Sequence, residues 1–154
     1  MAGKVPRADA KTLASIPMRI LVVGGCGERG MRFIRTLDRK RAQLSVLDNL
    51  SGGIGHFMEV AMYKGVKFYH ADVANLYSVI QAIDRVSQVY NFSLHKNEDS
   101  RGEFETNYLG SLNLIEAIAN TDNPPKLFTN SDDPLLKDFI SKNATKFGIT
   151  PEFI

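Results

Sequence analysis

ILVVGGCGERG, at residues 20–30, is followed along the chain by SVLD at residues 45–48. An unbroken apolar run such as Ile20–Val23 is typical of a buried parallel strand, and the glycines after it allow a sharp turn that approaches a phosphate closely. A helix that opens at Glu28 would direct its N-terminal amides at that phosphate. Asp48 ends the next strand at about the twenty-residue spacing at which an acid accepts hydrogen bonds from an adenosine ribose. The pattern therefore predicts a dinucleotide-binding half-site, in preference to a glycine turn of an unrelated α/β protein.

The overall composition is that of a globular domain without a membrane-spanning segment. At 154 residues the chain is long enough for one domain with a sizeable core, and its 44% hydrophobic and 23% charged residues are typical of soluble proteins. No apolar run approaches the length that crosses a bilayer. The net charge of +2 does not by itself indicate a nucleic-acid or membrane partner. Cys26 is the one cysteine, which excludes an internal disulfide and fits a reducing compartment.

Residues 1–17 carry mostly basic charge. Lys4, Arg7 and Lys11 stand against one acid, Asp9, and the apolar core of a secretory signal is missing. We expect an extended arm ahead of the first strand, with an organelle-targeting signal as the alternative. The expected location of the protein is therefore the mitochondrial matrix or the cytosol.

Strand-like apolar runs alternate with segments of helical period. This alternation predicts an α/β domain over residues 18–154 with three layers, Rossmann-like, built on a doubly wound parallel sheet of about five strands. Right-handed crossovers give the strand order 3-2-1-4-5 and place a cofactor crevice at the carboxyl edge where the order reverses. The runs are Ile20–Val23, Leu44–Leu47, Val66–Tyr69, Val86–Phe92 and Lys126–Thr129.

The segments between these runs predict helices. The last of them is expected to be capped by Asp133, to begin at Pro134 and to present an apolar face that includes Leu135 and Phe147. Its orderly end favours a complete small domain. Ile80 is expected to face the core from an earlier helix. The first helix is predicted to begin near Glu28, and the others are predicted to span residues 54–63, 76–84, 103–119 and 134–147.

Five motifs together resemble the extended short-chain dehydrogenase/reductase superfamily, most of all its UDP-sugar epimerases and nucleotide-sugar dehydratases. They stand in the family's order and spacing between residue 18 and about residue 131. They are GGCGERG at 24–30, LDNLS at 47–51, HADV at 70–73, VYNFSLHK at 89–96 and NYLGSLNLIEA at 107–117. The cofactor-binding residues that this resemblance implies are Gly24, Gly25, Gly27, Glu28, Arg29, Gly30, Asp48, Asn49, Asp72, Val73, Phe92, Ser93, Lys96 and Asn107.

The resemblance also locates the place of catalysis, where this chain departs from the family. Ser131 falls where the family has a catalytic serine or threonine. In the family a catalytic tyrosine, and a lysine four residues after it, come later in the chain. This sequence has no tyrosine after Tyr108. If the last helix corresponds to the family's catalytic helix, those positions fall near Leu135 and Phe139; otherwise the pair is absent. In either case the general acid/base is missing, so no catalytic residue is predicted and Ser131 is a remnant.

The expected cofactor site has departures of its own. Glu28 and Arg29 stand where the family usually has an aromatic and an aliphatic residue; Glu28 adds negative charge near the expected pyrophosphate, which Arg29 could offset. A bulky Leu94 could narrow the crevice. Asp48 favours NAD over NADP, because a carboxylate repels a 2′-phosphate. The expected cofactor is therefore NAD or NADP, with an empty site as the alternative.

Basic residues recur at helical spacing on the first helix. Arg29, Arg32, Arg35 and Arg39 are expected to form a solvated face, and docking to an acidic protein or contact with RNA through Arg32, Arg35 and Arg39 is left open. Specific nucleic-acid recognition is not expected, because the chain has no tryptophan and no aromatic residues interleaved with the basic ones.

Histidine and cysteine suggest no metal chemistry. His56, His70 and His95 lack the spacing of metal ligands, so no metal site is predicted. Cys26 lies near a helix N-terminus, which could lower the pKa of its thiol, although small-residue packing is the favoured explanation.

Three functions are compatible with these observations. We expect a non-enzymatic accessory or structural subunit of a larger assembly that keeps an NAD(P) site, for which the superfamily offers a precedent in an accessory subunit of respiratory complex I. One alternative is a free-standing NAD(P)-binding sensor. The other is a NAD-dependent epimerase or oxidoreductase that a partner chain completes.

Overall fold

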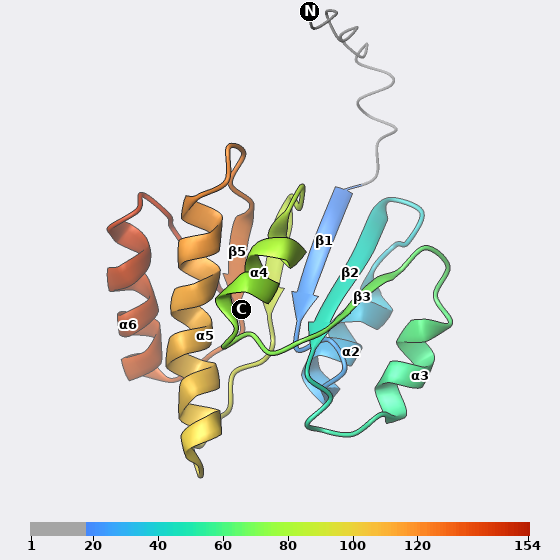
Figure 1. Cartoon of the computed structure of the whole chain (residues 1–154), viewed down its shortest axis with the longest axis horizontal. Coiled ribbons are helices and arrows are strands. Elements are labelled where there is room, and N and C mark those ends of the chain that lie inside the picture. The colour runs from blue at the N-terminus through green and yellow to red at the C-terminus, as the bar shows by residue number, and fades with distance from the viewer. Residues whose placement is uncertain (1–17) are drawn as a thin grey trace, which may run out of the picture.

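The computed structural model describes residues 18–154, in which strands and helices alternate (Figure 1). The predicted arm and any targeting signal fall within residues 1–17, outside the described residues. The strands are β1 (Met18–Val23), β2 (Ala42–Asp48), β3 (Lys67–His70), β4 (Gln88–Asn91), β5 (Lys126–Thr129) and β6 (Glu152–Phe153). The helices are α2 (Glu28–Thr36), α3 (Gly55–Ala61), α4 (Leu76–Ile83), α5 (Arg101–Ala119) and α6 (Pro134–Thr145).

The strands form one parallel sheet in the order β3-β2-β1-β4-β5-β6. The predicted order 3-2-1-4-5 is confirmed, but the expectation of about five strands is one short. β6 has two residues, too few to show a period in the sequence, and its pairing continues where the Ile154 N–H donates to the Thr129 carbonyl at 3.0 Å. The order reverses between β1 and β4, so the crevice of this doubly wound sheet lies at their carboxyl ends.

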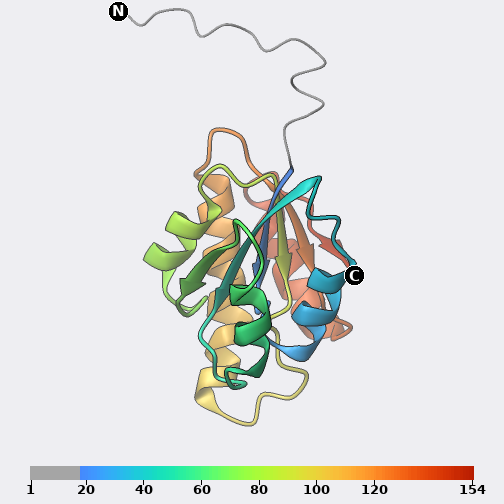
Figure 2. The same ribbon diagram turned by 90° about the vertical axis from the view of Figure 1, so that its right-hand side faces the viewer.

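Helices cover both faces of the sheet, and Figure 2 shows α4 and α5 on one side and α2 on the other. The side chains of β1 alternate between the two sides. Leu21 and Val23 pack into the core shared with α4, α5 and α6, whereas Ile20 and Val22 pack into the core shared with α2 and α3. Burial on both faces is the reason that this strand has no polar residue from position 20 to position 23.

The starts of α6 and α2 differ in a way that matters for binding. Asp133 caps α6 as predicted, accepting a 2.9 Å hydrogen bond from the Leu135 N–H, and Pro134 takes the first helical position. The cap position of α2 is Gly27, which has no side chain to accept such a bond. The first amides of α2 therefore remain available to another acceptor.

Three apolar side chains that the sequence predicts to face the core are exposed, which corrects those predictions. Ile80 of α4 is 49% exposed and Leu135 of α6 is 77% exposed. A helix turns by about 100° per residue, so Leu135 points away from the core that its neighbour Leu136 enters. Phe147 is 55% exposed because it lies beyond the last residue of α6.

Aromatic side chains line the α2 side of β4 and β5. Tyr90 stacks on Phe128 with ring centroids 4.4 Å apart, and Phe33 of α2 lies 4.4 Å from Tyr90. Phe128 is half-buried, and Ile154, which by strand alternation faces the same side, is 49% exposed. We call Tyr90, Phe128 and Ile154 the open sheet face, because they remain partly uncovered beside α2.

Candidate functional site

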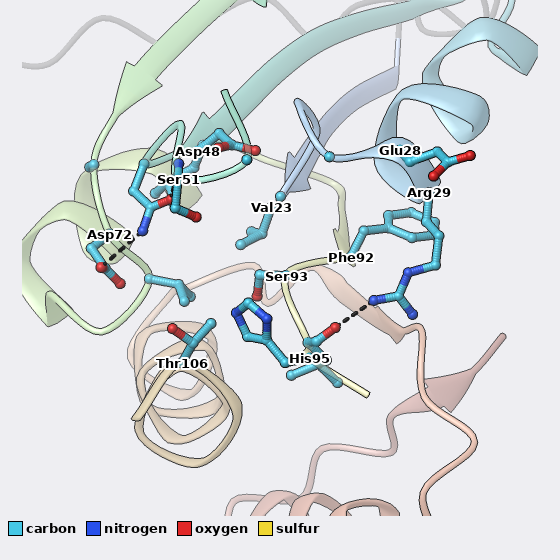
Figure 3. Close-up of a pocket in the computed structure, with 18 residues that line it drawn as sticks. Val23, Glu28, Arg29, Asp48, Ser51, Asp72, Phe92, Ser93, His95 and Thr106 are labelled. Carbon is cyan, nitrogen blue, oxygen red and sulfur yellow. Dashed lines mark hydrogen bonds between the residues drawn. The ribbon is translucent and has the colours of Figure 1, made fainter. Parts of the chain in front are cut away.

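A cavity of about 380 Å³ lies at the carboxyl ends of β1, β2, β3 and β4 (Figure 3). It is at the point where the strand order reverses, which is where open α/β sheets bind their ligands. Its lining comes from the turns after these strands, from the start of α2 and from α5. The lining residues are Val23, Gly24, Gly27, Glu28, Arg29, Leu47, Asp48, Asn49, Ser51, Gly52, Ala71, Asp72, Val73, Phe92, Ser93, Leu94, His95 and Thr106.

The glycine turn is held by close backbone packing. Gly24 has a φ of +75°, and a Cβ there would lie 2.7 Å from the Ser93 amide nitrogen. A Cβ at Gly30 would lie 2.8 Å from the Cα of Gly25. Gly25 and Gly30 are buried and do not line the cavity, so their role is to let β1, α2 and the turn approach one another. Gly24 and Gly27 do line it.

Asp48 stands at the end of β2 with its carboxylate held by two backbone donors. The Cys26 N–H donates to Oδ2 at 2.9 Å, and the Leu50 N–H donates to Oδ1 at 2.7 Å. Each carboxylate oxygen keeps a further acceptor position, so the group can still accept hydrogen bonds from a diol. This acid lines the cavity at the place that the sequence indicates for a ribose contact.

Cys26 is a packed thiol. Burial, followed by the nearby Asp48 carboxylate, raises the pKa of this thiol from 9.0 to about 12. The N-terminus of α2 does not overcome these two effects. Small-residue packing therefore accounts for Cys26, as the sequence favoured.

Asp72 and Val73, which follow β3, form another part of the cavity wall, and contacts with Asn49 and with α5 hold them in place. Asn49 donates a 3.2 Å hydrogen bond to Asp72 across the cavity rim, which Figure 3 marks with a dashed line. Asn113 of α5 donates to the Val73 carbonyl at 2.9 Å. Gly110 lets α5 approach, because a Cβ there would lie 2.7 Å from the Val73 side chain. Asp72 and Val73 are thus presented together beside Asp48.

Asn107 and Lys96 lie outside the cavity lining, unlike the other polar residues that the resemblance implies. Asn107 is fully buried, and its amide bonds both backbone groups of His95, accepting from the N–H at 2.7 Å and donating to the carbonyl at 2.9 Å. It also donates to Glu98 at 2.8 Å. Asn107 therefore positions the segment after β4, and Lys96 on that segment is exposed.

Three polar lining residues were not predicted as cofactor contacts. Ser51 follows β2, His95 follows β4 and Thr106 lies on α5, and all three border the cavity (Figure 3). In the sequence, His95 was considered as a metal ligand and as a member of the motif at 89–96, but not as a cofactor contact. Its position two residues after Ser93 was the available signal, but the backbone of His95 is held by Asn107 from α5.

Arg29 is exposed, as expected for a solvated face, but its guanidinium is hydrogen-bonded to groups outside α2. Its guanidinium donates to Asn130 Oδ1 at 2.7 Å and to the Leu94 carbonyl. This corrects the expectation that it offsets Glu28, which instead pairs with Arg32 at 3.3 Å. The Leu94 side chain is 3% exposed, so it is part of the core as well as of the cavity wall.

The other arginines of the predicted basic face, Arg32, Arg35 and Arg39, are exposed as expected, and each has a partner. Arg35 pairs with Glu59 at 2.8 Å, and the Arg39 guanidinium lies 3.8 Å from the centroid of the Tyr63 ring. Arg35 and Tyr63 hold the pKa of the Glu59 carboxyl at about 2. Glu59 lies on α3 and Tyr63 lies just after it, so the spacing of the arginines along α2 does not reveal these contacts.

Ser131 and the start of α6 form a separate region. The Ser131 hydroxyl oxygen accepts from the Asp133 N–H at 3.2 Å, and Ser131 does not line the cavity. Phe139 packs edge-on against Tyr108 with centroids 4.9 Å apart, while Leu135 is exposed. These two positions therefore offer no proton donor or acceptor.

Residues 18–154 contain no group of three or more His, Cys, Asp or Glu side chains arranged to hold a metal ion. In the same part of the chain, no helix is both long and apolar enough to cross a membrane.

The fold and the cavity define a nucleotide-binding α/β protein, and comparisons with known proteins narrow the class. Residues 20–134 match the model of the NAD dependent epimerase/dehydratase family. The chain belongs to this family. It is 29% identical over 119 residues to the UDP-glucose 4-epimerase of Mycoplasma genitalium, a match that covers 71% of this chain and 34% of that protein.

Solved structures share the fold. The Thermus thermophilus UDP-glucose 4-epimerase in complex with NAD has a TM-score of 0.69 at 22% identity, covering 88% of this chain and 54% of that one. The Bordetella bronchiseptica enzyme WbmF in complex with NAD+ has a TM-score of 0.73 at 18% identity, covering 90% and 49%. The chain thus spans about a third of the curated relative that it matches and about half of these structures.

Proposed function

We propose that this chain binds NAD through its adenosine diphosphate part and is catalytically inactive, acting as an accessory subunit of a larger assembly. The observation that carries the proposal is the amino-acid sequence of α6, the helix that follows Ser131. Its residues Pro134–Thr145 include no tyrosine, and Leu135 and Phe139 are apolar. Proton transfer to and from a sugar hydroxyl needs a positioned acid/base, and these side chains supply none.

The cavity fits the adenosine diphosphate part of NAD. The uncapped N-terminus of α2 offers amide donors for a pyrophosphate, and Gly24 and Gly27 leave the backbone open there. The fixed carboxylate of Asp48 suits a ribose diol and opposes a 2′-phosphate, which favours NAD over NADP. When bound, NAD supplies a hydride acceptor; this chain's residues hold its adenosine end.

A protein partner is supported by the surface. The open sheet face presents Tyr90, Phe128 and Ile154 on a parallel sheet, a class of sheet that is normally covered on both faces. Met58 of α3 and Met62 at its C-cap are 61% and 86% exposed and lie about one helical turn apart. Exposed apolar groups of this kind mark interaction surfaces.

The catalytic part of the proposal is tested with the purified chain and UDP-glucose in the presence of NAD. We expect no epimerised or dehydrated sugar and no reduced nicotinamide by absorbance. Conversion that disappears in Ser131→Ala would contradict inactivity and favour an enzyme whose own residues supply the chemistry. Ser141→Ala, a half-buried serine of α6 that does not line the cavity, is the matched control.

The subunit part is tested by native mass measurement of the endogenous particle. We expect a complex larger than the chain, and Ile154→Asp, on the open sheet face, should reduce its recovery. Met62→Asp alters the exposed apolar surface at α3 instead, so comparing the recovery of the two variants shows which surface contacts the partner. A monodisperse monomer with bound NAD would instead favour the free-standing sensor.

A further inference from the structure

Arg29 forms a bridge across one end of the cavity. It leaves the first turn of α2 and donates to the Leu94 carbonyl after β4 and to Asn130 Oδ1 after β5, at 2.7 Å in the second case. Figure 3 shows the side chain passing Phe92 toward the carbonyl that precedes His95. The bridge therefore spans the carboxyl ends of β1, β4 and β5.

Both acceptors of the bridge are fixed in place. Leu94 is 3% exposed, and its neighbour His95 is clamped by Asn107. The backbone N–H of Asn130 donates to the Asn91 carbonyl at 3.0 Å, and its side-chain Nδ2 donates to the Ile154 carbonyl at 3.0 Å. Because Nδ2 is held by Ile154, the amide oxygen of Asn130 is turned toward Arg29.

A dinucleotide needs both halves of such a crevice. The acid after β2 binds the adenosine ribose and the pyrophosphate lies at the helix N-terminus, so the second nucleoside must lie on the β4 and β5 side of the switch point. The first half is open and lined by Asp48, Asn49 and Asp72. The second half is the part that Arg29 crosses, and a guanidinium there also repels the positively charged nicotinamide ring of NAD+.

We infer that the site takes an adenosine diphosphate moiety, as in ADP or ADP-ribose, and that Arg29 is the specificity-determining residue that keeps the second nucleoside of a dinucleotide out. This inference rests on the proposed function, since it assumes that the cavity binds adenine nucleotides. NAD then binds by its adenosine half alone. The nicotinamide end stays in solvent, away from Ser131.

The test is titration calorimetry of the full chain with ADP, ADP-ribose and NAD+. In the unmodified protein we expect ADP-ribose and NAD+ to bind within about threefold of each other. Arg29→Ala should strengthen NAD+ binding by about tenfold and leave ADP within about threefold. Arg35→Ala, on the same helix but paired with Glu59 away from the cavity lining, is the matched control and should change neither.

A second variant and a second readout guard against a folding defect. Asn130→Ala removes one acceptor and should shift the NAD+ to ADP-ribose ratio in the same direction by a smaller factor. Saturation transfer from the protein to the nicotinamide protons should be absent in the unmodified protein and present in Arg29→Ala.

Several results would overturn the inference. NAD+ binding about tenfold more tightly than ADP-ribose to the unmodified chain would overturn it while leaving the cofactor site of the proposed function intact. Arg29→Ala weakening ADP as much as NAD+ would mean that Arg29 holds phosphate instead. Binding of none of the three nucleotides would overturn the cofactor site itself and the inference with it.

Discussion

The backbone N–H of Cys26 donates a 2.9 Å hydrogen bond to Oδ2 of Asp48, which joins the glycine turn to the end of β2. The carboxylate therefore has two tasks, one in the fold and one at the cavity. The Leu50 N–H occupies its other oxygen in the same way. This double hold keeps the acid facing the cavity in the absence of any ligand.

Substitution of Asp48 tests both tasks. Asp48→Ala should weaken adenine-nucleotide binding by about tenfold or more and lower the free energy of unfolding by about 1–3 kcal/mol, because two backbone donors lose their acceptor. Asp48→Asn keeps one acceptor oxygen, so it should recover part of the stability. Calorimetry and urea unfolding measure the two effects. Equal affinity in Asp48→Ala and in exposed Asp122→Ala would remove Asp48 from the site.

Gly30→Ala should destabilise the fold. The added Cβ would lie 2.8 Å from the Gly25 Cα and 3.0 Å from the Gly24 carbonyl carbon, and backbone atoms of a packed turn cannot move aside cheaply. We expect a loss of about 1–3 kcal/mol in urea unfolding. Gly55→Ala is the control, because nothing lies within 4 Å of a Cβ there. Similar unfolding midpoints for both variants would refute this account of the turn.

Cys26 should resist alkylation in the folded protein. The pKa of its thiol is raised to about 12, so at neutral pH the reactive thiolate is scarce and buried. Mass spectrometry after iodoacetamide treatment should find it unmodified in native buffer and modified in urea. Rapid labelling of the native chain would show that the turn opens.

The same shift predicts alkaline sensitivity. The folded pKa of about 12 lies above the unfolded value of 9.0, so the stability that Cys26 contributes is complete below about pH 9 and is lost as the pH rises toward 12. Cys26→Ala should flatten this part of the pH profile of the unfolding free energy. The pH dependence that remains in Cys26→Ala includes the contribution of tyrosines whose pKa values are also raised by burial, such as Tyr90.

Asn107→Ala should loosen the segment after β4. The change leaves the N–H and carbonyl of His95 without their partner, at a cost of about 1–3 kcal/mol. Hydrogen exchange at the His95 amide should accelerate, whereas Asn120→Ala, an exposed residue of the same helix region, should leave it unchanged. Unaltered protection at His95 would argue against the clamp.

The sequence determined much of this protein by local pattern. Ile20–Val23 specified a strand buried on both faces, Asp133 with Pro134 specified the start of α6, and the spacing from the glycines to Asp48 specified which strand end carries the acid. These features depend on residues close together in the chain or on crossover handedness, which has one dominant solution. The missing tyrosine on α6 is likewise a fact of sequence.

The directions of the charged and polar side chains depend on the tertiary structure. Arg29 had the same helical spacing as its neighbours, yet its partner Asn130 is 101 residues away. The burial of Asn107, the exposure of Leu135 and the two-residue strand β6 also follow from long-range packing and backbone pairing. A pattern of residue types records which face a side chain belongs to, but which group it meets depends on strands and helices brought together from the whole chain.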